Sequence, residues 1–274
     1  MKKVFSCVMS LLLLAAVVLP VIQPRAEVYA DDGFNGASFQ GNETEDIYFS
    51  YKEVDDGYIV SAVPQYANSS DYLNTCANTA GATAIGYYDR TYTNLIPDFE
   101  PGRYIRDIYM FYAQKPVIQE VINELYVTMG TNTVGNGTTA NGFRNGLKEY
   151  INDNGYNVTY PSIVSGGAPN MTSIKNMIDN KQIAVLFVSG YTLLSTYDYG
   201  KTDTHDQLFK SIYKGSHVLI VFGYHTVKYY NTSGSMFREN TMLYVATGFP
   251  SDPLARILLD DNTNLHEGNI INLY

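Results

Sequence analysis

The chain has 274 residues, of which 27 are acidic and 18 are basic, so its formal charge at pH 7 is −9. This acidity argues against nucleic acid or anionic lipid as a partner, because both require clustered basic residues. Apolar residues make up 45% of the chain, which is enough for a normal hydrophobic core and excludes an extensively disordered protein.

The N-terminus has the organisation of a secretory signal peptide. Two lysines precede an apolar run over residues 8–21, and small residues occupy the expected cleavage positions. We expect residues 1–30 to be the signal peptide, with cleavage after Ala30, or after Ala26 as the second choice. Because the run is short for a membrane span and contains Pro20, we expect no stable membrane insertion after cleavage. The mature protein is therefore predicted to be secreted, extracellular or associated with the cell surface.

Export leaves a mature chain with a single thiol. Cys7 lies within the predicted signal peptide, so only Cys76 remains, and the formal charge becomes −11 from 15 basic and 26 acidic residues. A lone cysteine cannot form an internal disulfide. Cys76 is therefore a buried spectator, an intermolecular linker or a reactive group.

After the signal peptide, residues 31–57 are predicted to be an N-terminal leader or extension, and residues 58–274 the main domain. Residues 31–45 are rich in Gly, Asn and acidic side chains, which is typical of a flexible segment. Apolar residues then alternate on both sides of Asp56 and Gly57, a pattern that predicts a hairpin-type turn.

The next part of the chain predicts helices. Small residues and the absence of proline predict a helix from Ala77 to Tyr88, with Asn74 or Thr75 as its N-cap. Apolar residues at helical spacing predict three further helices, around residues 117–125, 143–151 and 171–180.

β-Branched and aromatic runs dominate the C-terminal part. They predict strands over residues 183–189, 217–224 and 242–247. Helices followed by strands indicate an α+β protein with two segregated layers.

A reactive thiol needs a depressed pKa, which a helix N-terminus and a nearby protonated histidine both provide. The helix predicted to begin beside Cys76 supplies the first. Among four histidines, His217 is the best base candidate, because it opens an apolar strand and would be fixed in position with one open side. His225, at the end of the same run, is the fallback. The alternatives are a structural strand histidine and a cysteine that packs as a small apolar residue.

Four blocks of sequence resemble a known family. The blocks are similar, in the same order, to landmarks of papain-like cysteine peptidases, most closely those of the bacteriocin-processing (double-glycine leader) type and its secreted relatives: "VPQY…NTCANTAGATAIGYYDR", "GTTANGFRNGLKEYINDNGYNVTY", "IKNMIDNKQIAVLFVSG" and "SHVLIVFGYH". The separation of 141 residues between Cys76 and His217 fits papain-type enzymes. The resemblance implies a papain-like α+β domain over most of residues 58–250. A helical half would carry Cys76, and an antiparallel β half would carry His217.

The resemblance also implies an activity and further site residues. Cys76 and His217 would hydrolyse peptide bonds of a peptide or protein substrate through a thioester, without a cofactor. The family's oxyanion-hole glutamine falls on Ser70 here, so Gln65 or Asn74 is expected to donate instead. The position that orients the histidine falls on Thr247, and Asp252 in the following turn is the other candidate.

Two other classes of function are considered for this sequence, a metal site and a non-catalytic protein. Four scattered histidines and one cysteine lack the short, regular spacing of a metal site, so no metal is expected. A non-catalytic extracellular protein of the same fold remains the alternative. Its surface, with 25 tyrosines in the chain and an acidic balance, would then bind a partner or the cell envelope.

Overall fold

The computed structural model describes residues 37–59, 63–68, 72–97, 99, 103–106, 109–112, 116–133, 135–195, 203–260 and 262–274. The predicted signal peptide lies outside the described residues. Among the described residues, no helix has the length and apolar character needed to cross a membrane.

The described residues contain four helices and twelve strands. The helices are α1 (Cys76–Tyr88), α2 (Pro116–Thr128), α3 (Ala140–Asp153) and α4 (Met171–Asp179). The strands are β1 (Ser38–Tyr48), β2 (Tyr51–Tyr58), β3 (Arg103–Arg106), β4 (Tyr109–Tyr112), β5 (Val158–Thr159), β6 (Val164–Ser165), β7 (Ala168–Pro169), β8 (Ile183–Ser195), β9 (His205–Tyr230), β10 (Met236–Ala246), β11 (Leu254–Leu258) and β12 (Asn264–Leu273).

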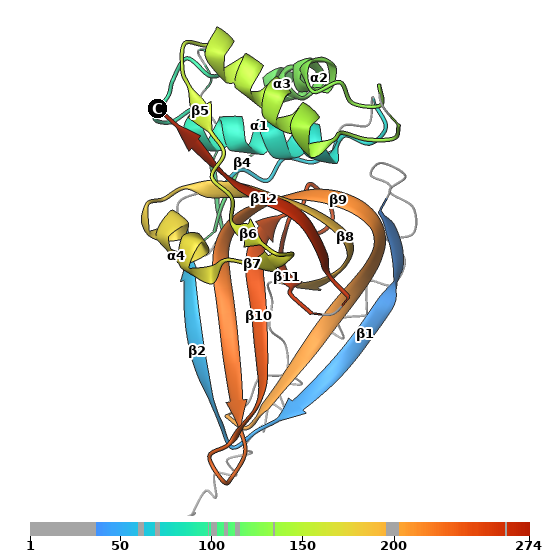
Figure 1. The fold of residues 1–274 in the computed structure, drawn as a ribbon, viewed down its shortest axis with the longest axis vertical. Coiled ribbons are helices and arrows are strands. Elements are labelled where there is room, and N and C mark those ends of the chain that lie inside the picture. Colours follow the sequence, from blue (N-terminus) through green and yellow to red (C-terminus); the bar gives the residue numbers. More distant parts are fainter. Residues whose placement is uncertain are drawn as a thin grey trace, which may run out of the picture.

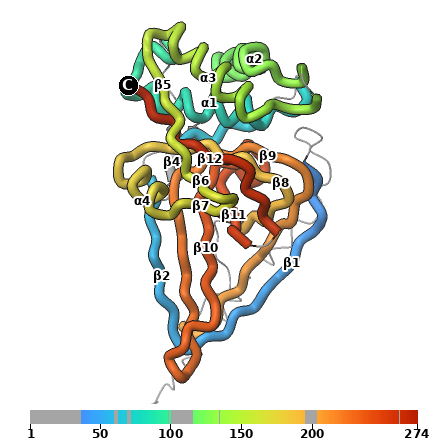
Figure 2. The backbone as a smooth tube through the Cα atoms, viewed as in Figure 1, coloured from blue at the N-terminus to red at the C-terminus, as the bar shows by residue number. Residues whose placement is uncertain are grey.

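One antiparallel sheet organises the molecule, and the 26-residue strand β9 is its spine. The strand order is β1-β9-β10-β11-β8-β12-β5, and β2 and β8 also pair with β9. Residues 205–214 of β9 pair with β1, and residues 223–230 pair with β2. In Figure 1, α1, α2 and α3 lie at one end of the sheet, while β1, β2, β9 and β10 run to the opposite end and converge there. The tube in Figure 2 shows the same convergence without the ribbon.

The prediction of a balanced α+β protein with a papain-like helical half is wrong. The structure is mostly β, with 44% strand and 24% helix. Residues 38–58 form β1 and β2, so residues 38–45 are no flexible leader, and the expected hairpin turn at Asp56 and Gly57 lies inside β2. Strand β9 is also far longer than the predicted 217–224, and β12 was not predicted at all.

The cause of this error is visible in β1. Only Ile47 among its residues is buried, so β1 has almost no apolar periodicity of its own. Its conformation comes from pairing with β9 along ten residues and from side-chain contacts across that pairing, such as the ion pair from Glu45 to Lys210 at 2.7 Å. Strand propensity depends on such context more than on composition.

Several local predictions are confirmed. Helices α2, α3 and α4 cover the three helical segments, and the side chain of Asn170 caps α4 by accepting a hydrogen bond from the Ser173 N–H. The predicted strands 183–189 and 217–224 lie within β8 and β9, and the third, 242–247, extends one residue beyond the end of β10 at Ala246. Helix α1 begins one residue earlier than predicted, at Cys76, and the Thr75 side chain makes no capping bond.

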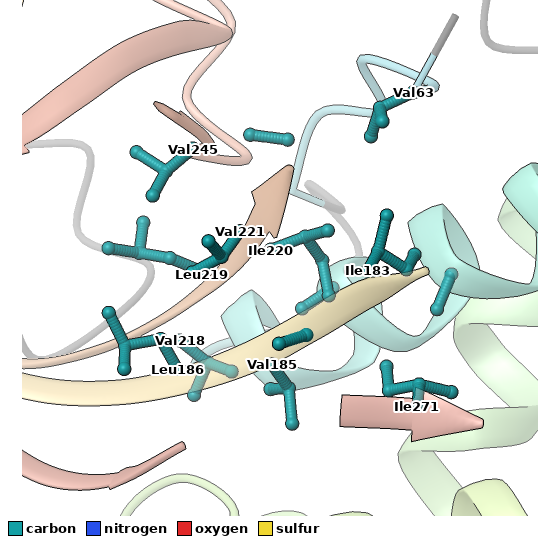
Figure 3. Packing of buried hydrophobic residues seen from close by; sticks show 14 of the residues in the cluster. Val63, Ile183, Val185, Leu186, Val218, Leu219, Ile220, Val221, Val245 and Ile271 are labelled. Carbon is teal, nitrogen blue, oxygen red and sulfur yellow. The ribbon is translucent and has the colours of Figure 1, made fainter. Parts of the chain in front are cut away.

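The main core lies where α1 meets the sheet. Of the 13 residues in α1, 12 are buried, and their small side chains allow neighbours to approach closely. A Cβ added at Gly81 would lie 2.9 Å from the Cδ1 of Leu125 in α2, so only glycine fits there without a shift. Figure 3 shows aliphatic side chains of β8 and β9, including Val185 and Leu219, packed beneath the helix. Helix α1 is therefore held rigidly against β9.

A second, smaller core lies toward the far end of the sheet. It consists of Ile47, Phe49, Leu194, Leu208, Val227, Tyr229, Met242 and Leu258. Beside it, Lys52 of β2 bridges both carboxylate oxygens of the buried Asp206 at 2.6 and 2.7 Å, and the Tyr229 hydroxyl donates to the same carboxylate at 3.0 Å. Residues from β1 and β2 are thus part of the folded sheet.

Candidate functional site

Cys76 is the first residue of α1 and lies against β9. Its thiol is free and only 9% exposed. Burial raises the pKa of the thiol to about 11, although hydrogen bonds from the backbone N–H groups of Val218, Ala77 and Cys76 act in the opposite direction. The first N–H groups of a helix have no partner within the helix, which leaves two of these donors for the sulfur. The expected acidification by the helix N-terminus is therefore present, but burial outweighs it.

His217 lies on β9, next to the residue that donates to the thiol. Its ring is 1% exposed, and Nε2 lies 2.8 Å from the carbonyl oxygen of Thr247. Because a carbonyl oxygen can only accept, Nε2 carries the proton in the neutral ring and Nδ1 carries the lone pair. Burial lowers the pKa of His217 to about 4, and the bond to Thr247 opposes this shift. The ring is therefore neutral at physiological pH.

The second nitrogen of His217 is available as a base. Within the described residues, Nδ1 is buried and has no hydrogen-bond partner. Buried polar atoms are almost always paired, so an unpaired one marks a place where another group is expected to bond. The next residue on β9, Val218, donates its backbone N–H to the Cys76 sulfur, so the strand that carries His217 passes beside the thiol. The roles of Cys76 and His217 as nucleophile and base stay predictions.

Parallel aromatic rings pack against the imidazole. The Phe249 ring lies parallel to it at 4.6 Å between centroids, and the Tyr191 ring at 5.7 Å. Tyr213 completes the stack, at 5.0 Å from Tyr191 and 5.4 Å from Phe249. Sequence reasoning missed these aromatic residues. Of these residues, only Phe249 could have been found from the sequence, because it lies two residues after Thr247, the predicted orienting position.

Thr247 orients His217 through its main chain. Its Oγ1 donates to the carbonyl of Asp252 at 2.6 Å and accepts from the N–H of Phe249 at 3.0 Å, and its own N–H donates to Pro253 at 3.0 Å. The side chain thus fixes the turn that presents the Thr247 carbonyl to the imidazole. Asp252 contributes its main-chain carbonyl to this turn. Both predicted residues therefore support the histidine, but neither does so by a direct side-chain bond to the ring.

The predicted oxyanion donors are less well placed. The Asn74 side chain donates to Oδ1 of Asn132 at 2.8 Å, and its backbone has a positive φ of 62°. That amide serves the loop that leads into α1. Gln65 is half-buried between the buried Pro64 and Tyr66, and within the described residues no hydrogen bond connects it to Cys76 or His217. Ser70 lies outside the described residues.

The other three histidines have partners elsewhere. The fallback candidate His225 bonds through Nδ1 to Asp56 at 3.0 Å. His205 bonds to Asp46 at 2.8 Å, and His266 bonds to Ser189 at 2.5 Å. Of the four histidines, His217 is the one next in sequence to Val218, whose N–H donates to the thiol. In the described part of the chain, no three His, Cys, Asp or Glu side chains cluster in a way that could hold a metal ion.

Comparison of the chain with protein-family models, curated proteins and solved structures gives no match.

Proposed function

We propose that this protein is a cysteine hydrolase that cleaves peptide bonds with Cys76 as nucleophile and His217 as general base. One observation carries the proposal. The His217 ring is fixed by Thr247 on one nitrogen and its other nitrogen is buried and unpaired within the described residues, while the next residue, Val218, donates its N–H to the thiol. A structural histidine would be expected to use both nitrogens in bonds to the protein.

The proposed mechanism starts from an uncharged Cys76 thiol and an uncharged His217 imidazole. With the thiol pKa near 11 and the imidazole pKa near 4, the resting site holds a thiol and a neutral imidazole. Substrate binding would bring the carbonyl carbon to the sulfur while Nδ1 of His217 accepts the thiol proton. The C–S bond forms as the carbonyl π electrons move to oxygen. His217 then gives the proton to the leaving amine as the C–N bond breaks, and water hydrolyses the thioester.

The proposal is tested with purified protein and a broad fluorogenic peptide library. We expect hydrolysis by the native chain and its loss in Cys76→Ala and in His217→Phe, with the fold retained by circular dichroism. A thiol-directed peptide epoxide should label Cys76, and mass spectrometry should map the adduct to it. Unchanged hydrolysis in Cys76→Ala would refute the assignment.

A second candidate, a non-catalytic binding protein, is favoured by one specific observation. The thiol is 9% exposed and the imidazole 1% exposed, so both reacting groups are covered. Alkylation by iodoacetamide in the folded state separates the two functions. A site that opens to substrate should react with iodoacetamide under native conditions, whereas an inert thiol should react only when the chain unfolds.

A further inference from the structure

The Tyr191 hydroxyl is a buried polar group without an explained role. Tyr191 is 1% exposed, and within the described residues its hydroxyl oxygen has no hydrogen-bond partner. A buried tyrosine hydroxyl normally bonds to a carbonyl, as Tyr150 does to Leu95 at 2.8 Å. We therefore expect the Tyr191 hydroxyl to bond to a group that is not part of the resting protein.

A bulge in the sheet sets the position of Tyr191. Between Ser189 and Tyr191 the pairing of β8 with β9 shifts register, and Gly190 has a positive φ of 57°. Bulges of this kind redirect a side chain and are frequent beside active sites. The result is that the Tyr191 ring lies parallel to the imidazole of His217, at 5.7 Å and an angle of 14°. The residue thus belongs to the wall of the candidate site.

The hydroxyl lies within electrostatic range of the thiol. The pKa of Tyr191 is raised by burial first, then by Tyr213 and by Cys76. Tyr191 therefore keeps its proton at every working pH and can act only as a donor toward an anion. It does not bond to Cys76 in the resting structure, so its donor remains free for a third group.

Another side-chain donor is needed at this site. In acyl transfer, the oxygen of the tetrahedral intermediate is stabilised by donors that are already in position. The Cys76 backbone N–H, which bonds to the sulfur in the resting site, would have to turn to the oxyanion, and the Asn74 amide is bonded to Asn132. Gln65 is not bonded to either catalytic residue. Among the buried side-chain donors without a partner in the described residues, Tyr191 is the one whose ring lies beside the imidazole of His217.

We propose that the Tyr191 hydroxyl donates a hydrogen bond to the oxyanion that forms when Cys76 attacks the substrate carbonyl. This inference rests on the proposed function, and it assigns a catalytic residue to it. As the C–S bond forms, the carbonyl π electrons become a lone pair on oxygen, and Tyr191 stabilises that charge while keeping its proton. The hydrogen bond is released when the carbonyl re-forms and the C–N bond breaks.

The test is Tyr191→Phe, which removes the hydroxyl and retains the ring beside His217. We expect kcat/KM for peptide hydrolysis to fall about 100-fold, the usual effect of losing one oxyanion donor. Binding of the peptide aldehyde N-acetyl-Leu-Leu-norleucinal should weaken similarly, because its thiohemiacetal mimics the intermediate. The rate of iodoacetamide alkylation of Cys76 should not change, because displacement at a saturated carbon forms no oxyanion. Tyr150→Phe, which loses a buried hydroxyl in α3, is the matched control and should hydrolyse peptides normally.

Three outcomes would overturn the inference. If Tyr191→Phe hydrolyses peptides at the native rate, Tyr191 donates nothing. If alkylation and hydrolysis fall by the same factor, the residue only packs against His217. If the native protein neither hydrolyses peptides nor binds the aldehyde, the proposed function itself fails, and the inference fails with it.

Discussion

The imidazole of His217 is oriented by a main-chain carbonyl, with Nε2 at 2.8 Å from the Thr247 oxygen. In cysteine and serine hydrolases a side-chain amide or carboxylate usually does this work, by fixing the tautomer and the plane of the ring. A carbonyl oxygen fixes the same tautomer and adds no full charge. Mutation cannot remove it, but its position depends on the turn that Thr247 stabilises with its own hydroxyl.

Thr247→Val should weaken this turn without removing the carbonyl. The substitution keeps the volume of the side chain but loses its two hydrogen bonds, each of which contributes about 1 kcal/mol. We expect thermal unfolding at a lower temperature and a several-fold lower kcat for peptide hydrolysis, with KM little changed. Thr247→Ser restores the hydroxyl and should recover both properties. An equally low kcat in the serine variant would show that the Thr247 hydroxyl does not position His217.

The stability of the fold should depend on pH through His217. Its folded pKa of about 4 lies below the ordinary value of 6.5, so the unfolded chain binds the proton more readily. The contribution of neutral His217 to the free energy of unfolding is fully present above pH 6.5. It is lost as the pH falls toward 4, by about 3 kcal/mol in total. Urea unfolding at pH 7, 5.5 and 4.5 measures this loss.

His217→Phe is the control for this pH dependence, because it keeps a ring in contact with Phe249 and Tyr191 but cannot titrate. Its stability should be flat between pH 6.5 and 4.5. Below pH 4.5 the protonation of Glu45 also reduces the stability of the fold, because the hydrogen bond from Arg238 lowers the pKa of Glu45 to about 2. If the native protein and His217→Phe lose stability in parallel above pH 4.5, the imidazole is not buried as a neutral group.

The sequence was informative where chemistry and periodicity are local. Cys76 and His217 could be paired from the compartment, the predicted helix start and the strand start, and in the structure the residue that follows His217 donates its N–H to the thiol. The aromatic walls could not be predicted in this way, because Tyr191 and Phe249 reach the site through sheet pairing and a turn, which no local pattern encodes.

The error in fold class has the same origin. The segment "SFQGNETEDIY" has the composition of a loop, yet it forms β1, because β9 offers a long partner edge. Its polar side chains form cross-strand bonds, such as Ser211 to Asn42 at 3.0 Å, rather than burying apolar surface. Pairing between strands far apart in the sequence thus decides the conformation of this segment more than its composition does. For this reason a segment predicted as part of an N-terminal leader is a strand of the sheet.

Asp206 should be a large contributor to the stability of the second core. Its carboxylate is 3% exposed and accepts bonds from Lys52 and Tyr229, which tie β2 to both halves of β9. Asp206→Asn removes the charge and leaves the Lys52 ammonium without its counter-ion. Because Lys52 remains partly exposed, we expect a loss of about 2 kcal/mol, less than for a fully buried pair.

The matched control is Asp203→Asn, which changes an exposed aspartate three residues away. It should alter the free energy of unfolding by less than about 0.5 kcal/mol. Guanidinium unfolding followed by tyrosine fluorescence measures both variants. Equal stability of Asp206→Asn and the native protein would mean that the ion pair contributes nothing net to the fold.

Removal of residues 1–58 should prevent folding rather than activate the enzyme. These residues include β1 and β2, which pair with β9 at ten and eight positions respectively. Without them, β9 would expose unpaired N–H and C=O groups along an edge, and the second core would lose Ile47 and Phe49. We therefore expect the truncated chain to be insoluble or to lack a cooperative thermal transition.

The comparison chain begins at Ala37, one residue before β1, and should fold and unfold like the native protein. An inhibitory leader would behave in the opposite way, because its removal would leave a folded protein with faster peptide hydrolysis. The two variants should be compared by soluble yield, circular dichroism and hydrolysis of the same peptide library. A folded and more active chain lacking residues 1–58 would show that β1 and β2 cover the site instead of supporting the sheet that carries His217.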